Sequence, residues 1–591
     1  MDTIIKSTLK TLNKTNHIIS LLNNELLCNS SIPPYMSSIG SHIRHILDFY
    51  DCIINRTSES HVDLTLRKRN VLVETKCTEA LKYYKEITDK LNNVNYNFDE
   101  DIYVIDDLGN GKIKILPIDY NIEFNSHHPY NRNNGSMGPN RGYQHILSAG
   151  IYAEIGPLSI QLKPEYLFSE NKDFEGFGEG PNGHYSATWA QRYRLWNKID
   201  MPERFGEKSI NKTLIGQSSI RLNFKGLSLG VSNENIWWGP SIRNSIMMSN
   251  HARGFKHITF NTTKPLKTKI GNFEWQVISG RLESSGYLPA GSDMQHAGTN
   301  IYIPKINQQG RTDDWRYLQG YSITYSPKWV PGLSLGFIRW VQMYAALVEG
   351  KYWWMEGSPT WFPAFQNLFR KNDKYENLEA QTNQAAGIFL RWLWKDSKAE
   401  IYVDYNHNDS KQNIRDLLID SDHSRAVTVG LQKVFKISTD DFLFSWEWTQ
   451  MEQTASRLLR NAGSWYEHSW TFDGYTNEGE VLGAGIGPGS NSHYFALNRI
   501  RVKEKLGIAL EIIDQDNDFF ISAFEEAQDF RRYWKDFNVH FSVQKKLKNL
   551  WGRINVVYIR SLNYQWELED FAEPYYHPGT DVNNLHVNLN L

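Results

Sequence analysis

The sequence predicts a small α-helical bundle fragment followed by one large all-β unit, a transmembrane antiparallel β-barrel of about 16 to 18 strands. Two observations predict this order. All 20 tryptophans lie between Trp189 and Trp566, whereas the 3 cysteines end at Cys77. Apolar residues recur at helical spacing over residues 1–95 and on alternate residues after Asp101. The predicted divisions are the helical fragment over 1–95, a linker or fusion junction over 96–112 and the barrel over 113–591.

The composition argues against several classes of protein. A formal net charge of -2 gives no large electrostatic field for nucleic acid. Mean hydropathy is -0.53, and no run of about eighteen apolar residues could form a membrane-spanning helix. Residues 1–24 carry lysines among their apolar positions, so no signal peptide is visible. The cysteines lack metal-type spacing, and no motif indicates a cofactor.

The helical part is predicted from two stripes of apolar residues. Ile39, Ile43, Leu47 and Tyr50 recur at three- and four-residue steps, and the segment 73–87 repeats this pattern. With a further helix over residues 4–27, the simplest arrangement is a set of antiparallel helices that bury their stripes together.

Residues 39–48, followed by 66–70 and Glu74, resemble the DinB-like four-helix family. The resemblance implies a divalent metal held by one histidine in this helix, which His42 matches, and by a histidine pair on a later helix. After Leu91 the chain becomes rich in Asn and Asp, so the helix that would carry the pair is missing and the match is partial. The alternative interpretation places His42 and His45 on a solvated helix face.

The second part is predicted to be all-β because apolar and polar residues alternate. Phe442, Phe444, Trp446 and Trp448 share one face of a predicted strand, and mostly polar residues share the other. The same alternation occurs over residues 158–163, 220–225, 537–544 and 585–591. Such segments fill almost the whole chain after residue 101, which favours one large all-β unit.

The ends of these strands favour a barrel of the outer membrane. Trp329, Trp392, Trp394 and Trp551 lie at predicted strand ends, where amphipathic rings form girdles at the membrane interfaces. Short turns such as 225–226 alternate with long polar loops such as 483–491, an asymmetry typical of outer-membrane barrels. The alternative is a soluble sandwich or propeller, in which these rings fill a core or line a sugar groove.

An ordered series of motifs supports the membrane barrel. The motifs are residues 124–130, 134–137, 141–144, 156–161, 164–165, 234–240, 244–250, 252–255, 474–476, 479 and 481–491. Together they resemble the Wzi-type capsule assembly family over about residues 110–591. The resemblance implies an outer-membrane barrel that acts as a lectin, attaching or organising capsular or extracellular polysaccharide at the cell surface without catalysis. It also implies a monomer with outer-membrane lipid around it.

The candidate polysaccharide-binding residues combine flat rings with amides, a carboxylate and an arginine, which suit the C–H faces and hydroxyl groups of sugars. The alternative interpretation is packing, with an ion pair between Arg253 and Glu234 across the barrel interior. The candidates are Glu234, Asn235, Trp237, Trp238, Asn244, Arg253, Trp353, Trp354, Trp465 and Tyr466.

Two other functions remain open at this point. An outer-membrane pore or transporter would have an open lumen and would conduct ions. A DinB-like metal-dependent enzyme would need a complete ligand cluster around His42. Paired acids such as Asp313 and Asp314 also fit glycosidase chemistry, but most of them are better explained as turn residues.

Overall fold

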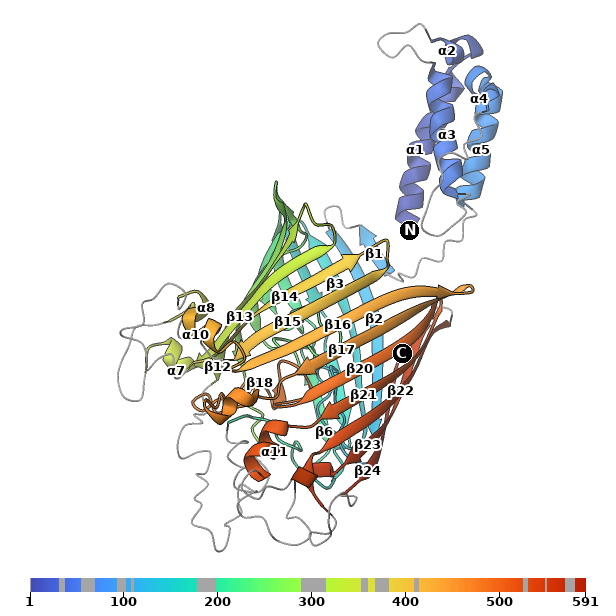
Figure 1. Cartoon of the computed structure of the whole chain (residues 1–591). Helices are drawn as coiled ribbons and strands as arrows, with labels where there is room; N and C mark the ends of the chain where they lie inside the picture. Colours follow the sequence, from blue (N-terminus) through green and yellow to red (C-terminus); the bar gives the residue numbers. More distant parts are fainter. Residues whose placement is uncertain are drawn as a thin grey trace, which may run out of the picture. The chain divides into compact units, whose positions relative to one another are not determined.

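The structure is a computed structural model, and it divides into two compact units, Met1–Asp101 and Ile102–Leu591 (Figure 1). Each unit is considered by itself. The described residues are 2–30, 38–54, 70–92, 103–107, 111–177, 198–287, 315–351, 360–366, 382–408, 414–524, 530–547, 550–568 and 580–591.

The first unit is helical, as predicted. Asn23 caps one of its helices by accepting a hydrogen bond from the Leu26 amide at 2.9 Å. The predicted stripe residues Ile43, Leu47 and Ile87 are buried in a common core. The described helices are α1 (Asp2–Leu21), α2 (Asn24–Cys28), α3 (Ile39–Ile54), α4 (Leu72–Thr75) and α5 (Cys77–Asn92).

A buried acid ties three of these helices together. Asp48 on α3 is fully buried and accepts a hydrogen bond from the hydroxyl of Tyr83 on α5 at 3.0 Å. Arg44 bonds the second oxygen of Asp48 at 2.9 Å and also pairs with Glu74 on α4. The charge of Asp48 is therefore compensated inside the bundle, as a buried carboxylate requires.

The second unit is a sheet whose strands are all antiparallel. The predicted linker over 96–112 overlaps its first strand and the start of its second, and the predicted domain limits stay a prediction. The strands are β1 (Tyr103–Asp107), β2 (Gly111–Asn125), β3 (Gly142–Ile155), β4 (Leu158–Leu162), β5 (Glu165–Ser169), β6 (Ile210–Leu214), β7 (Ser219–Phe224), β8 (Leu227–Ser232), β9 (His257–Thr262), β10 (Leu266–Lys267), β11 (Gly271–Leu282), β12 (Arg316–Pro327), β13 (Leu333–Tyr344), β14 (Asn383–Trp394), β15 (Ala399–Asn408), β16 (Arg425–Ile437), β17 (Asp440–Gln450), β20 (Asn491–Arg501), β21 (Glu504–Asp514), β22 (Lys535–Leu547), β23 (Leu550–Leu562) and β24 (Val582–Asn590).

The sheet closes on itself. The last strand pairs with β2, with His586 opposite Asn125 and Asn590 opposite Asn121. β4 and β5 pair with different parts of β3 and together form one interrupted strand of the barrel. When each interrupted strand is counted once, the described residues form a closed barrel of 18 strands. This agrees with the predicted number, and the even count follows from an antiparallel closure that returns the chain to the end where it started.

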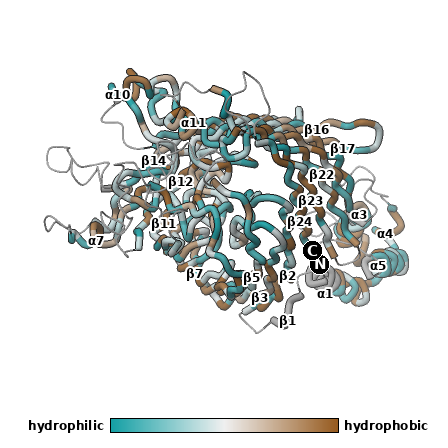
Figure 2. Tube along the Cα trace, turned by 90° about the horizontal axis from the view of Figure 1, so that it is seen from below, coloured by the Kyte–Doolittle hydropathy of each residue, from teal (hydrophilic) through white to brown (hydrophobic). Residues whose placement is uncertain are grey.

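The barrel is apolar outside and polar inside, which confirms the predicted membrane barrel. Ile220, Leu222 and Phe224 on β7 are 56%, 56% and 67% exposed. The inward residues Glu447 and Thr449 on β17 are buried, opposite the outward ring of Trp448. Hydrophobic and hydrophilic residues alternate along the strands in this way around the barrel (Figure 2). A soluble sandwich would bury these apolar side chains, so this outer surface suits lipid.

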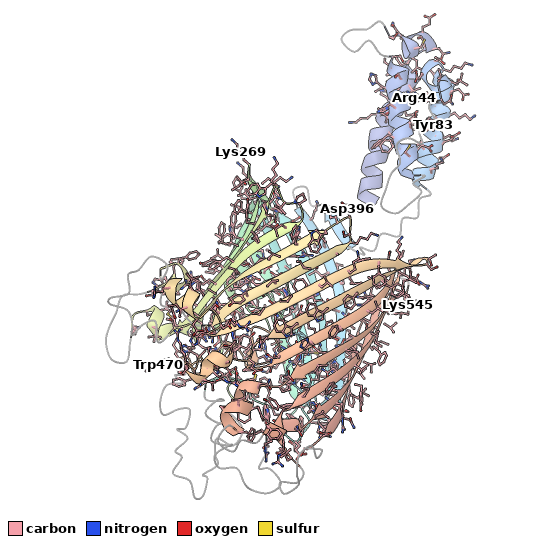
Figure 3. The ribbon with its side chains drawn as sticks, viewed as in Figure 1. Arg44, Tyr83, Lys269, Asp396, Trp470 and Lys545 are labelled. Atoms are coloured by element: carbon pink, nitrogen blue, oxygen red, sulfur yellow. The ribbon has the colours of Figure 1, made fainter. Side chains whose placement is uncertain are left out.

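The connections differ sharply between the two ends of the barrel. At one end the turns are short, such as Lys225–Gly226 with φ of 47° and 91°. Figure 3 shows Lys269, Asp396 and Lys545 toward this short-turn end and Trp470 at the opposite, long-loop end. The rings of Trp392 and Trp394, 5.1 Å apart, lie at the short-turn end of β14 as a predicted interfacial girdle would.

The remaining short elements belong to the long connections. They are α7 (Ala345–Val348), α8 (Pro363–Gln366), α10 (Ile414–Ile419), η4 (Ala455–Leu458), β18 (Thr476–Asn477), β19 (Glu480–Val481), α11 (Asn517–Phe524), η5 (Phe530–Arg532) and η6 (Tyr564–Trp566). Within the described part of the chain, no helix combines the length and apolar character needed to cross a bilayer.

Candidate functional site

Three long connections fold into the barrel and fill its centre. These segments, 126–141, 233–256 and 451–490, are called the plug. Backbone hydrogen bonds join them, from the Gly135 amide to the Asn250 carbonyl at 2.8 Å and from the Ser249 amide to the Leu482 carbonyl at 2.7 Å. The plug also packs on the wall, since the rings of Tyr475 and Trp340 on β13 stack with centroids 3.9 Å apart. The lumen is therefore occupied by protein, not left as an open bore.

One wall carboxylate receives the plug backbone. Glu447 on β17 accepts hydrogen bonds from the amides of Ile242 at 2.7 Å and Asn244 at 2.7 Å, and the Arg243 amide lies 3.1 Å away. The hydroxyl of Tyr402 donates to the same carboxylate at 2.7 Å. Several donors on one buried carboxylate stabilise its charge and fix the path of the plug.

A second wall carboxylate holds the side chain of Arg243. Its Nε and one terminal nitrogen reach the two oxygens of Glu511 on β21 at 3.0 and 2.7 Å, a bidentate ion pair with no solvent exposure of Glu511. The hydroxyl of Tyr130 joins this group, 2.8 Å from Arg243. The plug is thus attached to β17 and β21 by buried charge-assisted bonds.

Glu234, Asn235 and Trp237 lie at the start of the second plug segment. Glu234 pairs with Arg221 of β7 at 2.6 Å, and the two line a cavity of about 470 Å³ together with Asn235. Trp237 is half-buried and donates from its ring nitrogen to the Ser241 carbonyl at 3.1 Å. Glu234 and Asn235 are polar and partly accessible, but they face this cavity inside the barrel.

Four other candidates are buried in the plug. Trp238 is 3% exposed and donates to Gln276 at 2.8 Å, and Asn244 is 1% exposed and bonds Ser492 at 2.8 Å. Trp465 and Tyr466 are 2% and 1% exposed. In this conformation a polysaccharide does not reach them, so the structure shows them as packing groups and their sugar contact stays a prediction.

The proposed ion pair between Arg253 and Glu234 is wrong. Arg253 pairs instead with Glu478 at 2.8 Å, inside the plug, and Glu234 pairs with Arg221 of the wall at 2.6 Å. Trp353 and Trp354 lie outside the described residues.

A different group of residues forms a cleft at the long-loop end. This outer cleft, a cavity of about 200 Å³, is lined by five connections that are far apart in the sequence. Its rings pack edge to face: Trp534 lies 5.2 Å from Tyr564 and 5.0 Å from Trp566. The lining residues are His128, Pro129, Tyr130, Arg132, Phe174, Met201, Glu203, Ile486, Gly487, Pro488, Ser490, Gln515, Asp516, Trp534, Asp536, Tyr564, Gln565 and Trp566.

A strained turn presents part of this lining. Asn563, Gln565 and Trp566 have φ of 51°, 58° and 58°, a left-handed conformation that is costly for residues with side chains. The turn is held by the Arg532 side chain, which donates to the Trp566 carbonyl at 3.0 Å, and by the Asn563 side chain, which donates to the Tyr533 carbonyl at 2.8 Å. Strain of this kind persists where the surroundings fix it and is common at binding sites.

The cleft offers hydrogen-bonding groups more than fixed positive charge. Burial lowers the pKa of His128 to about 3, so its imidazole is neutral at physiological pH. Burial, with the nearby Glu175 carboxylate, raises the pKa of Glu567 beside the turn to about 7. Trp534 donates from Nε1 to Asp536 at 2.9 Å, and the Gln515 amide donates to the other Asp536 oxygen at 2.8 Å. Flat rings surrounded by neutral and charged polar groups, Arg132 among them, are the surface that a saccharide requires.

The outer cleft is not evident from the sequence. Tyr533 and Trp534 are a neighbouring aromatic pair there, and residues 127–130 are part of the 124–130 motif. The sequence signals are aromatic and polar clusters in five separate connections, and only the closure of the barrel brings them together.

In the helical unit, His42 and His45 lie on the exposed face of α3. No group of three or more His, Cys, Asp or Glu residues that could hold a metal ion occurs in the described parts of the chain. The DinB-like resemblance and the metal role of His42 stay predictions.

The closed strands, the apolar outer surface and the anchored plug define a plugged β-barrel of the outer membrane. The family model described as "Capsule assembly protein Wzi" matches residues 126–556. That match spans most of the chain, so this protein belongs to the Wzi capsule assembly family.

Solved structures give remote similarities. One is Wzi, an outer membrane protein involved in group 1 capsule assembly in Escherichia coli and reported as a carbohydrate-binding β-barrel: 11% identity, 93% of this chain and 97% of that chain, TM-score 0.49. Others are OccAB4 of Acinetobacter baumannii, at 8% identity, 80% and 97% coverage and TM-score 0.36, and OprD of Pseudomonas aeruginosa, at 9%, 80% and 94% and 0.34. No curated protein sequence matches the chain.

Proposed function

We propose that this protein is a non-enzymatic, lectin-like barrel that attaches or organises capsular polysaccharide at the cell surface. The observation that carries the proposal is the outer cleft, where the half-buried rings of Trp534 and Phe174 stand beside Gln515 and the Asp536 carboxylate. Tyr564 is 3% exposed and packs behind them. Membership of a capsule assembly family supports the choice of polymer.

The location of the cleft supports this role. Outer-membrane barrels have short periplasmic turns and longer loops on the extracellular side. The cleft is built from connections at the long-loop end, such as those that carry Gln515 and Tyr564. It therefore faces the medium, where capsule is located.

The bonding of the three acids that line the cleft argues for binding without hydrolysis. Glu203 accepts hydrogen bonds from the Phe177 backbone amide at 3.1 and 3.2 Å, and Asp516 accepts one from the Phe519 backbone amide at 3.1 Å. Glycosidases need one carboxyl group to transfer a proton and a second to act as base or nucleophile. Both oxygens of Asp536 are engaged, one by the Trp534 ring nitrogen and one by the Gln515 amide. All three carboxyl groups hold the lining in place, which suits a binding site.

The plug argues against the pore or transporter alternative. It is anchored through Arg243 and Glu511 and occupies the lumen that a pore would need to keep open. Exposed apolar residues such as Phe224 and Phe541 make lipid the partner of the outer surface. Closure of the strands removes any free sheet edge, so a monomer is sufficient.

Complementation of a strain that lacks the gene tests the proposal. The variant Trp534→Ala should lower cell-bound polysaccharide and raise released polysaccharide, with total polymer unchanged. Trp470→Ala is the matched control, because Trp470 is 48% exposed among the long loops but does not line the cleft. Equal retention by wild type and Trp534→Ala, with the variant folded in the outer membrane, would refute attachment through this cleft.

The helical unit is a separate question. A DinB-like metal-dependent enzyme stays as the second alternative for this unit and rests on the partial match at His42. Metal analysis of the purified full chain, compared with His42→Ala, would decide it: equal metal content in both removes the alternative.

A further inference from the structure

A second cavity lies on the short-turn side of the plug. This inner chamber has a volume of about 410 Å³, within the range of roughly 300 to 1,000 Å³ that small-molecule sites occupy. It is lined by inward residues of β2, β22, β23 and β24 and, on the side of the plug, by plug residues. The lining residues are Asn121, Glu123, Tyr130, Arg132, Asn133, Asn134, Arg243, His540, Gln544, Trp551, Gly552, Arg553, Asn555, His586, Asn588 and Asn590.

The register of the strands gathers side-chain amides on one wall. Asn590 of β24 lies opposite Asn121 on one side and Arg553 on the other, and Asn588 lies opposite Asn555. The Asn588 amide donates to Asn121 at 2.9 Å. Each amide offers both a donor and an acceptor, so the wall can exchange bonds with the hydroxyl groups of a sugar.

A tryptophan lies beside this wall. Trp551, Arg553 and Asn555 alternate along β23 and line the chamber, whereas Ile554 on the opposite face is 46% exposed toward lipid. The prediction that Trp551 belongs to an outer girdle is therefore wrong. Its ring is 37% exposed, with the Lys546 ammonium 5.7 Å from the ring centroid. An accessible ring next to amides provides a stacking surface for the C–H face of a sugar.

The charge of the lining favours an acidic ligand. The chamber contains the guanidinium groups of Arg132, Arg243 and Arg553 and the carboxylate of Glu123. Arg243 is committed to Glu511, and Glu123 is 3% exposed and bonded by the Asn134 and Gln144 amides. Arg553 is exposed in the chamber. A guanidinium in this position fits a carboxylate with two parallel bonds.

The inner chamber and the outer cleft are distinct cavities, and one plug segment lies between them. Tyr130 and Arg132 line both of them, so the plug segment around these residues separates the two. Trp551 and Asn590, by contrast, lie near the short-turn ends of β23 and β24 and line only the chamber.

We propose that the inner chamber is a second saccharide-binding site, which takes a short acidic saccharide by stacking on Trp551 and pairing its carboxylate with Arg553. This site goes beyond the attachment role proposed for the outer cleft, because it lies on the opposite, periplasmic side of the plug. It would bind polymer, or fragments of it, before they reach the cell surface.

Calorimetric titration of the purified full chain in detergent micelles tests this site. The probes are a uronic acid trisaccharide and a neutral glucose trisaccharide of the same linkage. Arg553→Gln should bind the acidic probe about tenfold more weakly, with the neutral probe unchanged. Trp551→Ala should weaken both. Arg501→Gln is the matched control, since Arg501 pairs with Asp440 near the same end of the barrel but outside the chamber.

The outer-cleft variant Trp534→Ala separates the two sites. If Trp534→Ala abolishes trisaccharide binding while Trp551→Ala and Arg553→Gln bind as wild type does, the inner chamber is not a saccharide site. If wild type binds neither probe, the proposal that the chamber is a saccharide site is refuted as well. Neither result affects the capsule-retention assay, in which Trp534→Ala alone tests the attachment role.

Discussion

The ring of Tyr402 lies over Gly430, its partner across the β15–β16 ladder, inside the barrel. A Cβ atom at position 430 would overlap this ring. The Tyr402 hydroxyl extends past the glycine to Glu447, the carboxylate that receives the plug backbone. Glycine at 430 therefore provides the space that lets a wall tyrosine hold the plug anchor.

We expect Gly430→Ala to displace the Tyr402 ring and weaken this anchor. Overpacking in a filled interior typically costs about 1 to 3 kcal/mol, so the heat-induced mobility shift of the folded barrel on a gel should occur at lower temperature. Gly552→Ala is the control, because the nearest atom to its added Cβ would be 3.7 Å away. Equal transitions for Gly430→Ala and wild type would show that the ring moves without cost.

The Arg243–Glu511 pair predicts a change in conductance. In Glu511→Gln the Arg243 charge stays buried without its counter-charge, a loss of about 3 to 5 kcal/mol for a buried pair. The plug should then detach more often, and planar bilayers should show channel openings that wild type lacks.

Asp581→Asn controls for loss of an ion pair as such. Asp581 pairs with Arg560 at 2.9 Å, and the arginine side chain is 39% exposed, so this change should cost less than about 1 kcal/mol and leave the barrel closed. If bilayer recordings of Glu511→Gln show no channel openings, the Glu447 anchor is sufficient to hold the plug.

Alternation along single strands made the fold predictable. The rings of Phe442, Phe444 and Trp446 point outward and Ser445 and Glu447 are buried, as the period of two requires. This pattern is local, so ten residues are enough to recognise each strand, and the preference for a closed membrane barrel follows from repeating it.

The plug and both cavities depend on contacts between distant residues. His128 reaches Tyr564 only because β24 pairs with β2, and Arg243 reaches Glu511 only because the plug turns inward. The local sequence around Trp238, a ring beside polar groups, is the same for a ring that packs in the interior and for a ring that binds sugar. Trp238 is buried because it bonds Gln276 of β11 and lies against Gly320 of β12, contacts that no local pattern indicates.

The buried acid of the helical unit gives a prediction that does not involve the barrel. Asp48→Ala leaves the Tyr83 hydroxyl and Arg44 without this partner, which should cost about 1 to 3 kcal/mol. Limited proteolysis of the full chain should cut the region 38–92 faster, with the barrel unchanged. Asp89→Ala, at an exposed position of α5, should behave as wild type. Faster cleavage in both variants would indicate a general effect of charge.

A buried aspartate at the start of α11 predicts a dependence on pH. Asp518 is 7% exposed and accepts hydrogen bonds from the Gln453 backbone amide at 2.9 Å and the Ser464 hydroxyl at 2.8 Å. It faces Arg457 at 3.8 Å, with the Asp516 and Glu452 carboxylates nearby. Burial is the main cause that raises the pKa of Asp518 to about 7.

The folded state therefore favours the protonated form of Asp518 more than the unfolded chain does. The resulting contribution to stability is complete below the ordinary pKa of an aspartate and is lost as pH rises through about 7. We expect α11 to exchange its amide hydrogens more slowly, after correction for intrinsic rates, at about pH 5 than at about pH 8.5. Asp518→Asn should abolish this difference, while the amides of β21 serve as an internal reference in both proteins. The same pH dependence in Asp518→Asn would assign the titration to another group.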